Sequence, residues 1–362
     1  MNDMETARWL ERDPFSMPAA EKAKALTATL TALVQWHRSH CPDYGRILDV
    51  VAEPGMPIDS LEAVPFIPVR LFKEFDLLSV GREQVFKTMT SSGTSGQQVS
   101  KIYLDKETAS LQGKVLVRLM AEVLGRKRLP MLVIDSPSVL KNRNAFSARG
   151  AGILGFSLFG QDVTYALDEE MNLDLAAIDA FLARHTDQPI FLFGFTFMIW
   201  QHFYQPLKAL GRKLAIDRGI LLHGGGWKKL QDQAVDTHAF RAAMVDCAGI
   251  GRVVNYYGMV EQTGSIFLEC EHGHLHAPIY ADVIIRNPRD FTPMAQGETG
   301  LIEVMSLIPR SYPGHALLTE DIGRIEGEDD CPCGRHGKYF SVAGRVAKAE
   351  ARGCSDTYET RS

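Results

Sequence analysis

Apolar residues recur at helical spacing near the start of the chain. Residues 19–40 carry Ala23, Leu26, Leu30, Leu33 and Val34 at intervals of three and four before the sequence reaches Cys41-Pro42. This pattern predicts an amphipathic helix with a structural role. Residues 67–78 predict a turn marked by proline, followed by a short helix.

From about residue 87 the pattern changes to short apolar runs separated by Gly, Ser and Asp. Such runs, short and bounded by turn residues, are typical of buried strands. The sequence between them predicts helices at residues 172–184 and 232–244. Strands that alternate with helices indicate an α/β sheet architecture. The four strongest runs lie at residues 131–134, 189–193, 219–222 and 252–256.

After about residue 265 the pattern predicts strands joined by turns, at residues 279–286, 300–305 and 323–326. We therefore expect four regions along the chain. They are a helical N-terminal region (1–80), an α/β region (81–265), a small β-rich subdomain (266–345) and a short C-terminal tail (346–362).

The composition is that of a soluble globular protein. The 362 residues are 45% hydrophobic and 23% charged, and 39 Lys plus Arg against 44 Asp plus Glu give a net charge of −5. This balance lacks the excess of basic residues that binding to a nucleic acid backbone requires. We find no apolar run near the roughly 18 to 20 residues that span a bilayer, and no apolar signal core at the N-terminus. We therefore expect a cytoplasmic protein with no membrane partner.

Six cysteines in a reducing compartment favour metal binding or thiol chemistry over disulfides. Cys331 and Cys333 form one pair of soft ligands, and Cys270 opens the segment CEHGHLH, with three histidines close behind. Two separated groups of this kind meet the tetrahedral requirement of zinc. Reduced thiols in two turns are the alternative. Cys41 and Cys247 lie among apolar residues and are expected to be buried and inert.

Three polar segments are candidates for chemistry. Residues 88–96, TMTSSGTSG, can turn backbone N–H groups and hydroxyls toward an anion, although the segment lacks the order of a P-loop and could be a surface loop. In residues 255–265, NYYGMVEQTGS, Tyr257 could stack on a base and Glu261 could hold Mg²⁺ or begin a helix. The acids of residues 317–324, LLTEDIGR, could hold sugar hydroxyls or close a turn.

Taken together, TSSGTSG, YYGMVEQTGS, TEDIGR and Gly344-Arg345 occur in the order found in the adenylate-forming enzymes. Within that superfamily, the sequence most resembles the acyl-protein synthetases of bacterial bioluminescence fatty acid reductases, and then the phenylacetate–CoA ligases. The resemblance runs from about residue 64 to 354. It implies the large N-terminal domain of the adenylate-forming fold, with mixed sheets and helices plus a small β-rich subdomain, and a C-terminal lid domain that is absent or vestigial.

The resemblance also assigns nucleotide-binding roles, and residues 81–265 become the adenylate-binding region. It implies that one loop grips the ATP phosphates, a glycine turn lines the adenine beside a stacking tyrosine, and an acid and an arginine hold the ribose. These positions are Ser91, Ser92, Gly93, Thr94, Ser95 and Gly96 for the phosphates, Gly224, Gly225, Gly226, Tyr257 and Gly258 for the adenine, and Asp321 with Arg345 for the ribose.

Three further positions follow from the resemblance. Glu261 would hold Mg²⁺, and Val260 stands where the superfamily usually has the threonine that contacts the α-phosphate, so Thr263 would have to supply that contact. Lys101 would be the lysine that closes the phosphate loop, although it is not adjacent to it. Apart from the resemblance, Phe156, Gly194, Phe195 and His223 could line an acyl or aryl pocket, although aromatic residues next to glycine more often belong to a core.

The cysteines also acquire roles. Similarity to the phenylacetate ligases implies a structural zinc site formed by Cys270, His276, Cys331 and Cys333, with His272 or His274 as substitutes. Cys354, in the polar tail RGCSDTYETRS, matches the cysteine that receives the acyl group in acyl-protein synthetases. An incidental exposed thiol is the alternative.

We therefore predict an ATP- and Mg²⁺-dependent enzyme that converts a carboxylic acid, fatty or aryl, into an acyl-adenylate. The acyl group then passes to Cys354 or to a partner reductase or carrier, and the resemblance allows an oligomer. A coenzyme A ligase is one alternative, but such enzymes add a C-terminal domain of about a hundred residues by resemblance, and about 17 residues follow Arg345 here. A zinc-stabilised nucleotide-binding scaffold without catalysis is the other.

Overall fold

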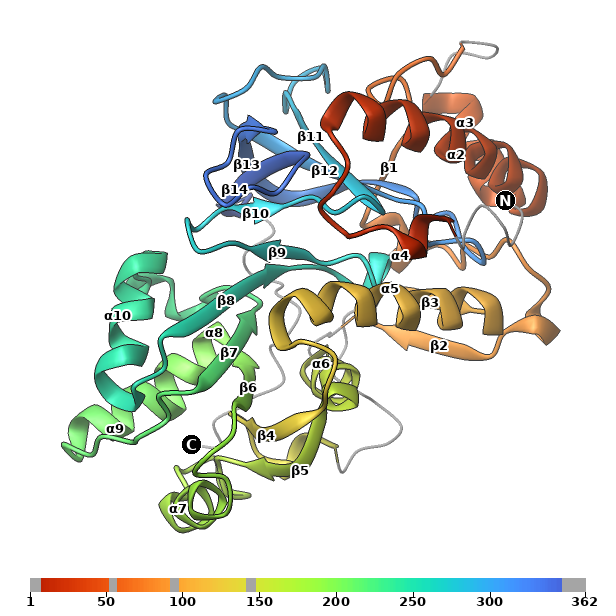
Figure 1. The fold of residues 1–362 in the computed structure, drawn as a ribbon. Helices are drawn as coiled ribbons and strands as arrows, with labels where there is room; N and C mark the ends of the chain where they lie inside the picture. Colours follow the sequence, from red (N-terminus) through yellow and green to blue (C-terminus); the bar gives the residue numbers. More distant parts are fainter. Residues whose placement is uncertain (1–7, 52–56, 92–97, 141–147, 347–362) are drawn as a thin grey trace. The chain divides into compact units, whose positions relative to one another are not determined.

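The computed structural model describes residues 8–51, 57–91, 98–140 and 148–346 (Figure 1), which group into two compact units. The first unit contains residues 8–51, 57–91, 98–119 and 258–346, and the second contains residues 120–140 and 148–257. The sequence-based division set the N-terminal helices apart from the β-rich subdomain, whereas the structure gathers both in the first unit.

The second unit is built on a parallel sheet with the strand order β8-β7-β6-β4-β5. The apolar runs of the sequence predicted four of these strands, and the structure confirms them. Strand β6 is buried at every position, as expected for a strand covered on both faces. The bounds are β4 (Leu129–Val133), β5 (Gly160–Tyr165), β6 (Ile190–Phe195), β7 (Gly219–Gly224) and β8 (Arg252–Tyr257).

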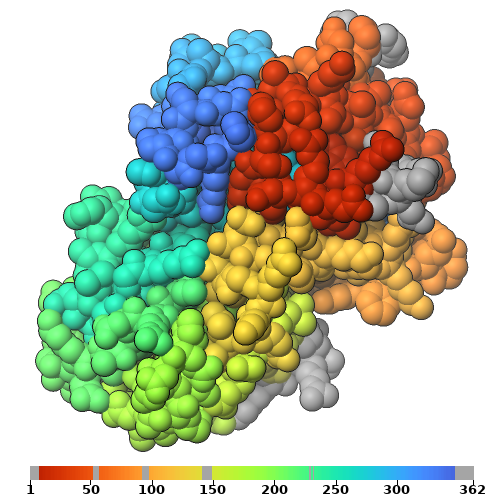
Figure 2. Space-filling view, in the orientation of Figure 1, coloured from red at the N-terminus to blue at the C-terminus, as the bar shows by residue number. Residues whose placement is uncertain are grey.

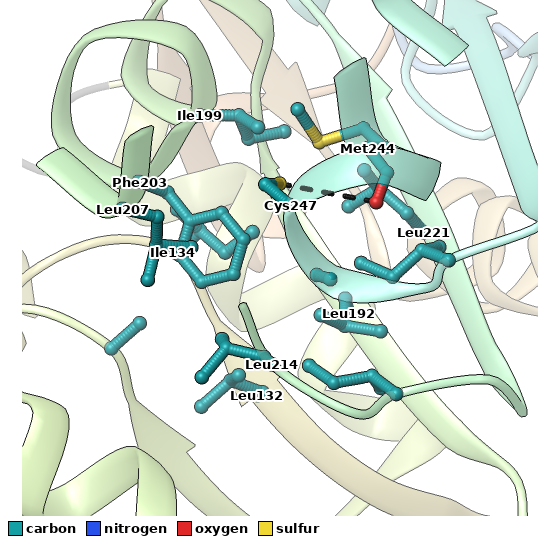
Figure 3. Packing of buried hydrophobic residues seen from close by; sticks show 14 of the residues in the cluster. Leu132, Ile134, Leu192, Ile199, Phe203, Leu207, Leu214, Leu221, Met244 and Cys247 are labelled. Carbon is teal, nitrogen blue, oxygen red and sulfur yellow. Dashed lines mark hydrogen bonds between the residues drawn. The ribbon is translucent and has the colours of Figure 1, made fainter. Parts of the chain in front are cut away.

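Helices of this unit pack on the sheet through one continuous apolar cluster (Figure 3). Leu192 of β6 and Leu221 of β7 face Phe203, Leu207 and Cys247 from the helices, and all five are buried. Two helices begin with an aspartate whose carboxylate accepts a backbone N–H. The helices are α6 (Ala148–Phe156), α7 (Leu175–Arg184), α8 (Thr196–Ile199), the π-helical turn η4 (Trp200–Tyr204), α9 (Gln205–Ala209) and α10 (Thr237–Ala248), with shorter turns η2 (Pro137–Leu140), η3 (Ser157–Phe159) and η5 (Lys228–Gln233).

The chain order of the sheet changes direction at β4. Strand β5 lies on one side of β4 and β6 on the other, so the carboxyl ends of β4 and β6 flank a topological switch point, where open α/β sheets bind ligands. Beyond β4, Arg149 of α6 donates to both carboxylate oxygens of the buried Asp135, at 3.0 and 2.9 Å. This bidentate pair fastens α6 to the carboxyl edge of the sheet.

The first unit contains an antiparallel sheet with the order β11-β12-β13-β14-β10-β9, and β1 pairs with β13 in parallel. The β-rich pattern predicted β11 and β12 closely, but β13 begins seven positions before the predicted run at residue 323. The bounds are β1 (Ile67–Pro68), β9 (Phe267–Glu269), β10 (Leu275–His276), β11 (Ala281–Arg286), β12 (Gly300–Ser306), β13 (Ala316–Glu328) and β14 (Lys338–Arg345).

The N-terminal helices attach to this sheet through polar contacts. Lys22 of the predicted amphipathic helix is buried, and its Nζ lies 3.2 Å from the Asp282 carboxylate on β11. The Asp329 carboxylate accepts the N–H of Ala19 at 2.9 Å. The surface of the first helices therefore adjoins that of the last strands (Figure 2). The helices are α2 (Ala19–His40), α3 (Pro42–Val51), α4 (Leu71–Glu74) and α5 (Lys106–Leu124), whose last residues belong to the second unit.

Two small elements complete the first unit: a hairpin of β2 (Lys87–Thr90) and β3 (Lys101–Leu104), and the turn η6 (Val260–Gln262). The turn η1 (Arg82–Gln84) precedes the hairpin. Among the described residues, no helix combines the length and apolar character needed to cross a membrane. The structure confirms the predicted mixed α/β class.

Candidate functional site

The base of the predicted phosphate loop is closed by Ser91 and Ser100. The Ser91 N–H donates to the Ser100 carbonyl at 3.1 Å, and the Ser100 N–H donates to the Ser91 hydroxyl oxygen at 2.9 Å. These bonds extend the β2–β3 hairpin by one pair, and Ser91 keeps its own hydroxyl proton for a further acceptor. The other predicted loop residues, Ser92, Gly93, Thr94, Ser95 and Gly96, lie outside the described residues.

Lys101 stands just beyond this loop, at the start of β3. Its Nζ lies 3.6 Å from a carboxylate oxygen of Asp76, and 52% of its side chain is exposed. Asp76 also accepts from the Tyr103 hydroxyl at 2.7 Å and from Arg82 at 3.0 Å. Hydrogen bonding by Tyr103 and then Arg82 lowers the pKa of the Asp76 carboxyl. Lys101 therefore lies at the hairpin, and its exposed ion pair with Asp76 contributes little to the free energy of folding.

Glu261 lies in the turn η6 with 5% of its surface exposed. Burial raises the pKa of its carboxyl, and the adjacent Ser100 hydroxyl opposes that shift. The Tyr312 hydroxyl donates to the Glu261 backbone carbonyl at 2.9 Å. A buried carboxylate on a fixed turn is suited to binding a cation, because the cation restores the charged form that burial disfavours.

The neighbours of Glu261 hold the turn from two sides. The Gln262 amide donates to the carbonyls of Gly314 and Val304, at 2.8 and 3.1 Å. Gly264 has φ +91°, and a Cβ there would lie 2.9 Å from the Gln112 Cα. The Thr263 hydroxyl donates its single proton to the Val260 carbonyl at 2.8 Å. In this conformation Thr263 therefore cannot also donate to a phosphate oxygen.

Asp321 and Arg345 meet across two antiparallel strands. They are directly opposed on β13 and β14, and the Arg345 Nε donates to the Asp321 carboxylate at 2.9 Å. The Thr319 hydroxyl accepts the Asp321 N–H at 3.1 Å and donates to the Ile302 carbonyl. The acid and the arginine that were predicted to hold a ribose are thus neighbours on one sheet.

In the second unit, the predicted adenine turn follows β7. A Cβ on Gly224 would lie 2.7 Å from the Tyr256 carbonyl, and Gly225 and Gly226 have φ +81° and +66°. The turn therefore requires glycine for close approach and then for positive φ. The half-buried Tyr257 ends the neighbouring strand β8, and the exposed Gly258 follows it as the first residue assigned to the first unit.

His223 and Thr196 lie directly beneath this turn. The Thr196 hydroxyl donates to the Gly224 carbonyl at 3.1 Å and lies 2.9 Å from the His223 Nδ1. Burial, with a smaller contribution from Arg241, lowers the pKa of His223 to about 3. The sequence reasoning named His223 but missed Thr196, whose position directly after a buried strand was the available signal.

The predicted acyl pocket residues are packed among aromatic rings. The Phe156 ring lies 4.7 Å from that of Phe193 and 5.2 Å from that of Tyr256, between centroids. A Cβ on Gly225 would lie 2.6 Å from the Phe195 ring, and a Cβ on Gly194 would lie 2.9 Å from Ile199. Phe156, Gly194 and Phe195 are thus buried, and the pocket assigned to them stays a prediction.

The Cys/His group of the first unit comes together as predicted. One ligand atom from each of Cys270, His276, Cys331 and Cys333 lies within 4.8 Å of all the others. The Cys270 and Cys331 sulfurs are 3.9 Å apart, and the Cys333 sulfur is 3.3 Å from the His276 Nε2. His274 lies at the edge, with its Nδ1 3.4 Å from the Cys331 sulfur. His272 is exposed in the turn.

The structure thus brings Ser91, Glu261, Asp321 and Arg345 into the first unit. There burial raises the pKa of the Glu261 carboxyl, and the positive charge of Arg345 partly opposes that shift. The structure places the glycine turn, His223 and Tyr257 in the second unit. The supporting residues Ser100, Gln262 and Tyr312 were not foreseen, because their contacts join segments far apart in sequence. Cys354 lies outside the described residues.

Comparison with solved structures shows the fold. The chain is similar to 2-hydroxyisobutyryl-CoA ligase in an open conformation, with a TM-score of 0.69 and 17% identity over 97% of this chain and 79% of that one. The same ligase in the postadenylation state gives a TM-score of 0.66 over 93% of this chain and 70% of that one. The predicted adenylate-forming fold is confirmed.

Comparison with known sequences identifies the family. The chain is 23% identical, over 92% of its length and 88% of the relative's, to the long-chain-fatty-acid–luciferin-component ligase of Vibrio harveyi. It is also 23% identical to the ligase of that name from Aliivibrio fischeri, over 82% of this chain and 78% of the relative. The family model described as acyl-protein synthetase, LuxE, matches residues 5–361. The chain therefore belongs to the acyl-protein synthetase (LuxE) family, as the sequence motifs predicted.

Proposed function

We propose that this chain activates a carboxylic acid with ATP and transfers the acyl group to a cysteine thiol. Membership in the acyl-protein synthetase family supports this reaction. The observation that carries it to particular residues is the buried Glu261 on its clamped turn, in the same unit as the closed loop base at Ser91 and the Asp321–Arg345 pair. The names of the relatives support a long-chain fatty acid as the substrate class and a protein as the acyl acceptor.

In the first step the substrate carboxylate is the nucleophile. Its oxygen bonds to the α-phosphorus of ATP as the bond from that phosphorus to pyrophosphate breaks, and the product is an acyl-adenylate. No residue needs to remove a proton, because the carboxylate is already ionised at neutral pH. The enzyme's task is to orient the two reactants and stabilise charge on the phosphates.

We assign the nucleotide contacts by part. Residues 91–96 and Lys101 would hold the phosphates, the turn of Gly224, Gly225 and Gly226 with Tyr257 and Gly258 would bind the adenine, and Asp321 with Arg345 would bind the ribose hydroxyls. Thr263 would reach the α-phosphate only after its hydroxyl leaves the Val260 carbonyl. Glu261 fits a Mg²⁺ ligand through its buried carboxylate, and a bound Mg²⁺ would supply charge neutralisation at the phosphates.

In the second step a thiolate attacks the acyl carbon, forming the C–S bond while the bond to AMP breaks. We propose Cys354 as this nucleophile, or a cysteine of a partner reductase or carrier. Burial raises the thiol pKa of Cys41, and that of Cys247 to about 12, so neither is suited to the role. A cytoplasmic location would keep the acceptor thiol reduced.

We further propose that Cys270, His276, Cys331 and Cys333 hold a structural zinc ion. Three thiols and one imidazole with ligand atoms this close fit a closed tetrahedral site. The site would join β10, which carries His276, to the turn before β14 that carries Cys331 and Cys333. Its role would be to stabilise the small strands of the first unit.

The test begins with ATP–pyrophosphate exchange across a panel of acids of different chain length. Activity with at least one acid is expected, and Glu261→Gln should require more Mg²⁺ for the same rate. Intact mass spectrometry after incubation with ATP and that acid should then show an acyl adduct, retained in Cys41→Ser and absent in Cys354→Ser. In a parallel incubation with coenzyme A added, acyl-CoA formation without a protein adduct would favour a coenzyme A ligase. ATP binding without exchange would favour a scaffold.

A further inference from the structure

The hydroxyl of Thr196 joins two groups at the carboxyl end of the parallel sheet, the Gly224 carbonyl and the His223 imidazole. It has one proton, which goes to the Gly224 carbonyl at 3.1 Å, because a carbonyl can only accept. The hydroxyl oxygen must then accept from His223, whose Nδ1 lies 2.9 Å away. The contact therefore fixes the neutral imidazole as the Nδ1–H tautomer.

This link stands where the strand ladder ends. The pairing of β6 with β7 runs from Ile190↔Gly219 to Phe195↔Gly224, and Thr196 is the next residue, the first of α8. The Gly224 carbonyl is held by a side chain at the point where the chain leaves the sheet. The two residues that follow, Gly225 and Gly226, both have positive φ.

The surroundings make the link rigid. Thr196 and His223 are 5% and 6% exposed, and the His223 ring packs 4.5 Å from that of Phe240. Phe195 fills the space beneath Gly225. Burial keeps the imidazole neutral at physiological pH, so its Nδ1–H donates without carrying charge. With so little exposed surface, Thr196 is suited to act through the turn rather than on a ligand directly.

We propose that Thr196 and His223 are positioning residues for nucleotide binding, which hold the Gly224 carbonyl so that the Gly225–Gly226 backbone faces the purine of ATP. This inference rests on the proposed function, in which the turn lines the adenine. The pair sets the affinity for the nucleotide and leaves the rate of the chemical step to other residues, because it does not contact the reacting atoms.

The test compares Thr196→Val, which loses the hydroxyl but keeps the shape, with Thr196→Ser, which keeps the hydroxyl. In ATP–pyrophosphate exchange with the full chain, Thr196→Val should raise the KM for ATP about tenfold, since it leaves a buried carbonyl and an imidazole N–H without partners. The kcat should stay within about twofold. Thr196→Ser should restore the KM to within about twofold of the wild-type value.

Thr29→Val is the matched control. Thr29 is also a buried threonine, 4% exposed, whose hydroxyl donates to the Ala25 carbonyl at 3.2 Å in α2. Its replacement should leave the KM for ATP unchanged. His223→Phe keeps the ring packed on Phe240 but removes the donor, and it should raise the KM about threefold, since the Thr196 bond to Gly224 survives. It provides an independent reading if Thr196→Val fails to fold.

Two results would overturn the inference. One is a folded Thr196→Val, or a folded His223→Phe, with the wild-type KM for ATP. The other is an equal rise in KM for Thr196→Val and Thr196→Ser, which would mean that the hydroxyl is not what matters. In both cases the wild-type chain still exchanges pyrophosphate, so the proposed function stands. A wild-type chain that neither binds ATP nor exchanges pyrophosphate with any acid would overturn both.

Discussion

Acid should destabilise this protein through a histidine that the fold keeps neutral. His315 is 1% exposed, its Nε2 lies 3.2 Å from the Tyr44 hydroxyl, and its ring stacks on that of His37 at 5.0 Å between centroids. Burial lowers the pKa of His315 to about 3 and that of His37 well below its usual value. The unfolded chain exposes both imidazoles, which then titrate near pH 6.5.

Acid lowers the stability because the unfolded state takes up more protons than the native state. Between pH 6.5 and about 3 the unfolded state binds a proton at His315 that the native state does not, so stability is full above pH 6.5 and falls as the pH falls. For a pKa of 6.5 in the unfolded state, the loss at pH 5.5 is about 1.4 kcal/mol for this one group. His37 adds a further loss of the same sign.

The assay is urea unfolding at pH 7.5 and pH 5.5, followed by tryptophan fluorescence. His315→Gln should make the difference in unfolding free energy between the two pH values smaller by about 1.4 kcal/mol. Comparing the variant with the wild type cancels other acid-sensitive groups, including metal ligands that protonate. The exposed His238→Gln is the control for loss of an imidazole at the surface. A His315→Gln variant that keeps the whole wild-type pH dependence would refute the reasoning.

Three other changes test the first unit. Asp282→Asn should lower the unfolding free energy measured in urea by more than about 3 kcal/mol, because Lys22 and Lys338, at 3.2 and 3.3 Å from its carboxylate, would lose their counter-charge. Lys22→Met should lower it less, since Asp282 keeps its ion pair with Lys338. A larger loss for Lys22→Met than for Asp282→Asn would contradict this account. Gly264→Ala should cost about 1–3 kcal/mol and should raise the Mg²⁺ concentration needed for exchange, because φ is +91° and the Cβ would meet Gln112; the exposed Gly297→Ala, also at positive φ but with open space around it, measures the backbone cost alone. Cys331→Ser should abolish stoichiometric zinc in metal analysis whereas His274→Ala retains it, and equal loss in both would place His274 among the ligands.

Local pattern was enough to predict much of the fold. Strands β4, β6, β7 and β8 are continuous apolar runs because their sheet is covered, and burial of that kind is visible in a short window of sequence. The Cys/His group was also predictable, since soft ligands in two close-set groups have few other uses.

What sequence reasoning missed depends on distant partners. Lys22 is a charged position of an amphipathic helix, and its burial depends on the Asp282 carboxylate together with the Ala277 and Ala281 carbonyls. The start of β13 at Ala316 was missed because its polar residues are paired through the sheet, as Thr319 is with the Ile302 carbonyl. Tyr312 and Ser100 support Glu261 from other parts of the chain, so no local motif marks them.

The chain order of the first unit has a consequence for synthesis. The second unit is nearly continuous in sequence, whereas the first joins residues near the N-terminus to strands made last, and the Lys22 contact with the Ala281 carbonyl spans 259 positions. On the ribosome, helix α2 is therefore synthesised long before its partner strand β11. Its apolar face and Lys22 stay in contact with water until β11 emerges. The early helices therefore lack their native partners for most of synthesis, which leaves them open to chaperone binding and to aggregation during translation.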